Sequence, residues 1–195
     1  MKVLFFGHSY VRDLSERCEW SHPLIIRGQP TKPDYLFRHF PGKDYEFLLN
    51  QPQEFETVAS INPDYIVVIL GGNSIVKSIT NVEINALATD FYERLRASLP
   101  NAVIIAAQIE PRYYPANNHF EAPTREEFNR RRVVLNNFVN KKLKKRGLVN
   151  HVAVLGSAMN FGPHSFRDGV HLLNKPLEDY QQIMLGALIY AAERQ

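Results

Sequence analysis

The chain has 195 residues, of which 45% are hydrophobic and 22% are charged, and its net charge is +3. This composition excludes a disordered chain, and the length is enough to bury one core, so we expect a single domain over residues 1–195. One cysteine excludes an internal disulfide and a cysteine-rich metal site. Neither a secretory signal nor an apolar stretch near the ~20 residues of a membrane span is visible, so we expect an intracellular, cytoplasmic location.

Short apolar runs alternate with helical patterns along the chain. Apolar runs predict strands at residues 2–6, 23–27, 45–49, 65–70, 102–107 and 151–155. Helices are predicted as a short one at 35–40, one at 55–61, one from the Thr80–Glu83 capping box, one from Thr124 to Gly147, and one from about Pro176. This alternation predicts an α/β fold, a three-layer α/β/α sandwich around a parallel sheet. Ligands bind such sheets at the carboxyl ends of the strands, so the loops after the strands are the candidate sites.

Ser9 stands on the turn between the first predicted strand and the first helical pattern. The apolar run stops at Gly7-His8-Ser9, and Val11 and Leu14 follow at helical spacing. A serine at this point has two interpretations. Its hydroxyl caps the helix, or the free N–H groups and positive dipole end make it a suitable nucleophile. The position alone favours the cap.

Asp168 and His171 lie three positions apart in a loop before the last helix. At this spacing a carboxylate can accept the Nδ1 proton of the imidazole, which leaves Nε2 free to take a proton from a hydroxyl. The alternative is a surface carboxylate beside a loop histidine, which the spacing alone favours. The amide of Asn73, after Gly71-Gly72, and the backbone N–H of Gly28 can donate to an oxyanion, although ordinary turns explain each glycine site taken singly.

Four stretches of this chain resemble the four sequence blocks of the SGNH (GDSL-type) hydrolases, and they occur in the same order. They are Gly7-His8-Ser9, Gly28, Gly71-Gly72-Asn73 and the stretch from Asp168 to His171. The resemblance covers essentially the whole domain and implies a flavodoxin-like fold with a mostly parallel five-stranded sheet. It implies that Ser9 is the nucleophile, His171 the general base and Asp168 its orienting partner. It also implies an oxyanion hole made by Ser9, Gly28 and Asn73. The implied activity is hydrolysis of an acetyl or longer acyl ester without a metal or organic cofactor.

Two positions depart from the pattern of the family, which usually has aspartate where this chain has His8 and commonly where it has Ser74. His8 can support the nucleophile, compete for its hydroxyl or fill a structural hydrogen-bonding place, and we favour the structural role. The Gly-His-Ser form of the first block also resembles the SGNH-like domains in proteins of some eukaryotic mobile elements. That looser resemblance implies a domain of a longer protein.

Other readings of the sequence stay open. The first alternative is a catalytically weak or inactive binding domain of the same fold, for nucleic acid or another partner. Nucleic acid would bind the cations of the long helix, Arg130, Arg131, Arg132 and those from Lys141 to Arg146. The second is an acyltransferase that passes the acyl group to an alcohol at the same site. Tyr113, Tyr114 and Phe120 in the long loop at 108–123 either form a wall of the substrate pocket or pack on the domain. The histidines outside the blocks are scattered singly, so we expect no metal site.

Overall fold

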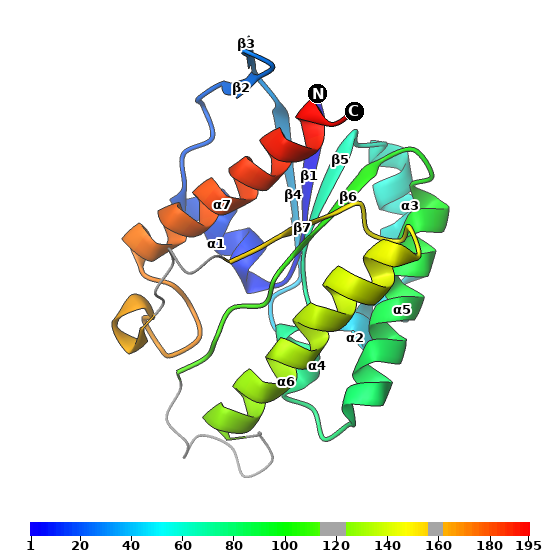
Figure 1. The fold of residues 1–195 in the computed structure, drawn as a ribbon, viewed down its shortest axis with the longest axis vertical. Coiled ribbons are helices and arrows are strands. Elements are labelled where there is room, and N and C mark those ends of the chain that lie inside the picture. Colours follow the sequence, from blue (N-terminus) through cyan, green and yellow to red (C-terminus); the bar gives the residue numbers. More distant parts are fainter. Residues whose placement is uncertain (114–123, 156–161) are drawn as a thin grey trace.

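The computed structural model describes residues 1–113, 124–155 and 162–195. In these residues five parallel strands form a central sheet in the order β4-β1-β5-β6-β7 (Figure 1). The strands are β1 Lys2–Gly7, β4 Asp34–His39, β5 Tyr65–Ile69, β6 Val103–Ala107 and β7 His151–Ala153. This is the flavodoxin-like strand order, and it confirms the predicted α/β sandwich with a five-stranded parallel sheet.

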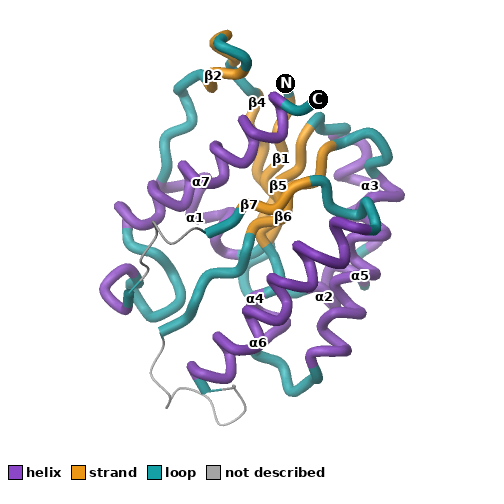
Figure 2. Tube along the Cα trace, viewed as in Figure 1, coloured by secondary structure: helices purple, strands orange, loops and turns teal. Residues whose placement is uncertain are grey.

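Helices cover both faces of the sheet, as Figure 2 shows. One face packs against the segments α2 Tyr45–Leu49, α3 Pro52–Ile61, α4 Gly72–Ile75, α5 Asn81–Ser98, α6 Arg125–Phe138 and its π-helical continuation η1 Val139–Leu143. The other face packs against α1 Ser9–Arg17 and α7 Asn174–Glu193. A short 3-10 helix, η2 Pro163–Ser165, precedes the loop that leads into α7.

Strand β1 shows why the sequence forms a doubly covered sheet. Leu4 and Phe6 point into the core beneath α5, whereas Val3 and Phe5 point into the core beneath α1 and α7. All four side chains are buried. Because side chains alternate along a strand, a continuous apolar run supplies both cores at once.

Two predictions of local structure were wrong, and one predicted strand lies outside the central sheet. Residues 35–40, expected as a helix, form most of edge strand β4, because Tyr35 and Phe37 pack on one face of the sheet and Leu36 on the other. Residues 45–49, expected as a strand, form α2, which the Asp44 carboxylate caps by accepting from the N–H of Phe47 at 2.9 Å. Residues 23–27 contribute β2 Leu24–Ile26, which pairs only with β3 Gln29–Thr31 in a separate hairpin.

The other predicted helices are present, with small shifts at their ends. Thr80 and Glu83 form the predicted capping box of α5. Thr124 caps α6 by accepting from the N–H of Glu127 at 3.1 Å. The last helix begins at Asn174, two residues before the predicted Pro176.

The two ends of the chain lie side by side at the amino ends of the strands (Figure 1). The Tyr65 hydroxyl, at the start of β5, donates to Oε1 of Gln195 at 3.0 Å. Tyr65 in turn pairs with Val3 near the start of β1. None of the helices in the described parts of the chain combines the length and apolarity needed to span a bilayer.

Candidate active site

The turn after β1 brings the backbone close to β5. Gly7 has a φ of +154°, and a Cβ added there would lie 1.9 Å from the carbonyl oxygen of Ile69. The next residue, His8, donates its N–H to that same carbonyl at 3.1 Å. Only glycine fits this approach, which sets the direction in which α1 leaves the sheet.

His8, not Ser9, is the N-cap of α1. The Nδ1 atom of His8 accepts from the N–H of Tyr10 at 3.4 Å, and its side chain is buried. Burial, with smaller contributions from the charges of Arg112 and His171, lowers the pKa of His8 to about 3. The imidazole is therefore neutral at physiological pH and available as a cap, which is the structural role favoured from the sequence.

Ser9 is consequently the first residue of α1, and its hydroxyl is not used as the cap. The first N–H groups of a helix have no partner within the helix, and here His8 satisfies that of Tyr10. The Ser9 Oγ instead lies 3.0 Å from Nε2 of His171. The two residues are 162 positions apart in the sequence, so this contact depends on the assembled fold.

Asp168 and His171 share one tight hairpin between η2 and α7. Arg167 donates its N–H to the carbonyl of His171 at 2.7 Å, and Gly169 at the tip has a φ of +78°. Two further contacts fasten the hairpin to the domain. The Tyr10 hydroxyl donates to the carbonyl of Val170 at 2.5 Å, and the N–H of Tyr113 donates to that of Gly169 at 2.7 Å.

The Asp168 carboxylate fixes the imidazole. Its Oδ2 lies 2.7 Å from Nδ1 of His171, while its Oδ1 accepts the N–H groups of Val170 and His171 at 3.0 and 2.7 Å. Burial raises the pKa of Asp168, but the hydrogen bonds from His171 and Val170 outweigh it and bring the pKa to about 2. An ionised carboxylate holds the proton on Nδ1, so Nε2 is left to accept the proton of the Ser9 hydroxyl.

Asn73 lies at the carboxyl end of β5, the strand that neighbours β1. Gly7 and Ile69 are register partners in these two strands, so the turns that follow them are adjacent. The Asn73 amide donates from Nδ2 to the carbonyl of Lys43 at 3.0 Å, and its Oδ1 accepts from Nη2 of Arg112 at 2.9 Å. The amide is therefore held at the same edge of the sheet as Ser9.

Gly28 does not reach this site, which corrects the oxyanion-hole assignment. It lies in the turn of the β2–β3 hairpin, next to Arg27, whose guanidinium donates to the carbonyl of Glu193 at the C-terminal end of α7. That end of α7 lies beside the chain ends (Figure 1), whereas Ser9 follows the carboxyl end of β1. The loop after β4, which contains Gly42 and Lys43, follows the strand beside β1 and contacts Asn73 through the Lys43 carbonyl.

The predicted aromatic wall is only partly within the described residues. Tyr113 lies beside the hairpin that carries Asp168 and His171, with its ring 5.3 Å from that of Phe166. Tyr114 and Phe120 lie outside the described residues. Arg112, which sequence reasoning did not single out, contacts Asn73 directly. No motif marks it, and only its place after β6 could have drawn attention to it.

A buried carboxyl lies near the site without taking part in the contacts of Ser9. Glu110 is 4% exposed. Burial raises its pKa to about 7, against the opposing effects of the Tyr180 hydroxyl and the Arg112 and Arg132 charges. Glu110 therefore changes charge near neutral pH, and its charge also raises the pKa of buried Tyr10 after the larger effect of burial.

Part of the basic stretch on the long helix has structural contacts. Arg131 is buried and donates to the carbonyls of Ile75 and Lys77 at 2.7 and 3.1 Å. Arg130 pairs with Glu127 on the surface of the same helix. Nucleic-acid contact through the remaining cations stays a prediction.

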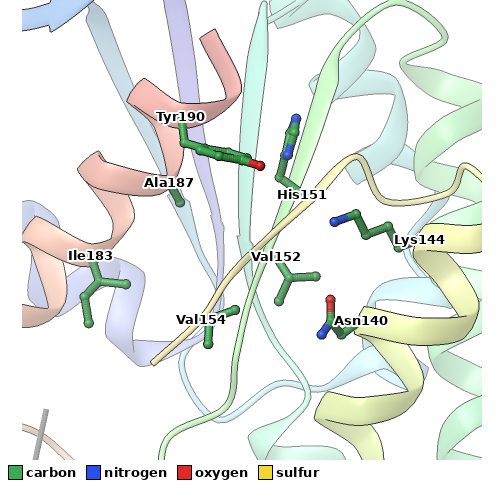
Figure 3. A pocket seen from close by; sticks show the side chains of 8 residues that line it. All are labelled: Asn140, Lys144, His151, Val152, Val154, Ile183, Ala187 and Tyr190. Carbon is green, nitrogen blue, oxygen red and sulfur yellow. The ribbon is translucent and has the colours of Figure 1, made fainter. Parts of the chain in front are cut away.

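A separate hollow of about 340 Å³ lies outside strand β7, between η1 and α7 (Figure 3). Val152 and Tyr190 form apolar parts of its lining, and Lys144 and His151 form polar parts. None of the residues predicted for the esterase site lines it, whereas Lys144 is one of the cations predicted for nucleic-acid contact. Within the described residues, no group of three or more acidic, histidine or cysteine side chains is arranged to hold a metal ion.

Comparison with known proteins identifies the fold. A GDSL-like lipase from Bacteroides thetaiotaomicron is similar over 99% of this chain and 88% of its own, with 16% identity and a TM-score of 0.63. A lipase/acylhydrolase from Enterococcus faecalis is similar over 97% and 95%, with 16% identity and a TM-score of 0.64. A carbohydrate esterase of family 3 from Talaromyces cellulolyticus is similar over 100% and 99%, with 17% identity and a TM-score of 0.66. No protein-family model and no curated protein sequence matches the chain. The chain thus has the fold of the SGNH hydrolases, as the sequence blocks led us to expect.

Proposed function

We propose that the chain is a serine esterase that hydrolyses acetyl or longer acyl esters of carboxylic acids. The observation that carries the proposal is the continuous hydrogen-bonded series from Ser9 through His171 to Asp168, with separations of 3.0 and 2.7 Å. These distances are within the reach that proton transfer requires. The series stands at the carboxyl edge of a fold shared with proteins described as lipases, acylhydrolases and esterases.

In this mechanism Nε2 of His171 takes the proton of Ser9 while Oγ attacks the ester carbonyl. The C–O bond to the alcohol then breaks, and His171 gives its proton to the departing oxygen. Water attacks the acyl-serine with His171 again as the base, which releases the carboxylic acid and restores Ser9. Asp168 remains ionised throughout, because its pKa of about 2 lies far below physiological pH.

The oxyanion would be stabilised by the N–H of Ser9 at the start of α1 and by the Nδ2 group of Asn73. The further backbone donor would come from the loop at 40–44 and not from Gly28. This loop follows β4, the other neighbour of β1 in the sheet. It already contacts Asn73 through the carbonyl of Lys43, and a Cβ added at Gly42 would have no atom within 4 Å.

The test is hydrolysis of p-nitrophenyl acetate and p-nitrophenyl butyrate, together with labelling by a fluorophosphonate. We expect turnover and labelling by the wild-type protein, and loss of both in Ser9→Ala. Ser15→Ala is the matched control, because Ser15 lies on the same helix and, among the described residues, its hydroxyl donates to the carbonyl of Arg12. A folded wild-type protein with no turnover above buffer and no label on Ser9 would refute the proposal.

A further inference from the structure

Arg112 is held rigidly beside the candidate oxyanion hole. Its backbone N–H donates to Oδ1 of Asn129 at 3.3 Å, and its carbonyl accepts from Nδ2 of the same side chain at 3.1 Å. Its guanidinium carbon lies 4.7 Å from the centre of the Phe128 ring. Two neighbouring residues of α6 therefore fix the backbone and the side chain of Arg112.

The guanidinium and the Lys43 carbonyl select one orientation of the Asn73 amide. Nη2 of Arg112 donates to Oδ1 at 2.9 Å, and Nδ2 donates to the carbonyl of Lys43 at 3.0 Å. A flipped amide would place its NH₂ group against a cation and its oxygen against a carbonyl, so it would lose both bonds. The observed orientation leaves the second hydrogen of Nδ2 for an oxyanion.

The charge of Arg112 also affects how strongly Nδ2 donates. A cation bonded to the amide oxygen draws electron density from the nitrogen, and linked hydrogen bonds strengthen one another where water is scarce. The bond between Arg112 and Asn73 is partly buried, and Gly72 and His8 beside it are buried. A Cβ added at Gly72 would lie 3.1 Å from Nη2 of Arg112, which shows how closely the guanidinium packs there.

We propose that Arg112 is a positioning residue that orients and polarises the Asn73 amide for oxyanion stabilisation. The proposal rests on the proposed esterase function and adds a residue to it. The effect proposed here passes from Arg112 through the Asn73 amide to the oxyanion. Removal of Arg112 should therefore lower kcat more than it changes KM, because the oxyanion forms only during the reaction.

The first experiment is a double-mutant cycle on p-nitrophenyl acetate hydrolysis. Arg112→Met should lower kcat about tenfold, less than the ~10²–10³ typical of a lost donor, because Lys43 still holds the amide. Arg112→Lys, which keeps a charged donor, should recover most of the loss. In an Asn73→Ala background Arg112→Met should have no further effect, since the amide it positions is gone. Arg130→Met, the same change on the surface of α6, should leave kcat unchanged.

Two results would overturn the proposal. One is an Arg112→Met enzyme with kcat within twofold of the wild type, and the other is a loss of the same size with and without Asn73. If Arg112→Met does not fold, Arg112→Gln takes its place, because the shorter, uncharged side chain also removes the guanidinium bond to Asn73. The same loss of kcat and the same dependence on Asn73 are then expected.

A second measurement separates this proposal from the esterase proposal. The side-chain amide signal of Asn73 in a ¹⁵N NMR spectrum is identified by its absence in Asn73→Ala. It should shift in Arg112→Met and stay in place in Arg130→Met. A shift in a protein without esterase activity would refute the esterase proposal while the positioning contact stands. An unmoved signal would refute the positioning contact whatever the activity.

Discussion

Replacement of His8 by asparagine should make the stability of the fold less sensitive to acid. Asparagine is as good an N-cap as the helix can have, so α1 keeps a side-chain acceptor for the N–H of Tyr10. It cannot titrate. The variant therefore isolates the energetic cost of keeping a buried imidazole neutral, apart from a constant offset due to its smaller volume.

The magnitude follows from the two pKa values of His8. In the unfolded chain the pKa is about 6.5, and in the folded protein burial lowers it to about 3. Between these values the unfolded state binds a proton that the folded state does not, so stability falls as the pH drops below 6.5. At pH 5 the loss is about 2 kcal/mol, and it keeps growing until the pH reaches about 3.

The assay is urea unfolding of wild type and His8→Asn at pH 7.5 and pH 5.0. We expect the wild type to lose about 2 kcal/mol more than the variant over this interval, equivalent to about 4–8 °C in Tm for a chain of this size. His22→Asn makes the same change at an exposed histidine and should leave the pH dependence of the wild type intact. Parallel pH curves for wild type and His8→Asn would refute the account of a buried, neutral cap.

Three further changes test other parts of the structure. Asp168→Asn should keep the hairpin bonds but place an NH₂ group against Nδ1, so kcat on p-nitrophenyl acetate should fall by about 10³–10⁴; a fall below tenfold would contradict the role of Asp168. Gly7→Ala should lower Tm by roughly 10 °C or prevent folding, because the added Cβ would clash with the carbonyl oxygen of Ile69. Gly28→Ala should lower Tm by only a few degrees, because a Cβ added at Gly28 has no atom within 4 Å. In the wild type the free energy of unfolding should fall as the pH rises from about 4.5 to about 7, because in this range only the folded protein keeps the Glu110 proton. Glu110→Gln should remove this fall. Urea unfolding curves in which the variant keeps the fall would rule out Glu110 as its source.

The sheet and its helices were predictable wherever the sequence pattern reflects burial on both faces. Strands β1, β5 and β6 are short apolar runs in the interior of the sheet, and each was placed within a residue or two. Edge strand β4 was not, because its polar residues Arg38 and His39 interrupt the alternation that marks a strand. Helix α2, with only five residues, is too short for a helical period to be recognised.

The errors in the site follow from those errors in the sheet. Gly28 is predicted at the site because it follows the strand predicted at 23–27, whereas in the structure the strand beside β1 is β4, which the loop with Gly42 follows. Asp168 and His171 could be paired from the sequence because they are three positions apart. The contact of Arg112 with Asn73 joins residues 39 positions apart. It depends on the packing of α6, so no local pattern predicts it.

The adjacency of the chain ends affects how this domain can be handled and combined. Both ends leave from the amino edge of the sheet, while Ser9 and the hairpin with Asp168 and His171 stand at the carboxyl edge. A domain of this form can be inserted into a longer polypeptide as a side module, since entry and exit occur at one place. If the protein is attached to a solid support through either end, the edge of the sheet that carries Ser9 would face away from the support.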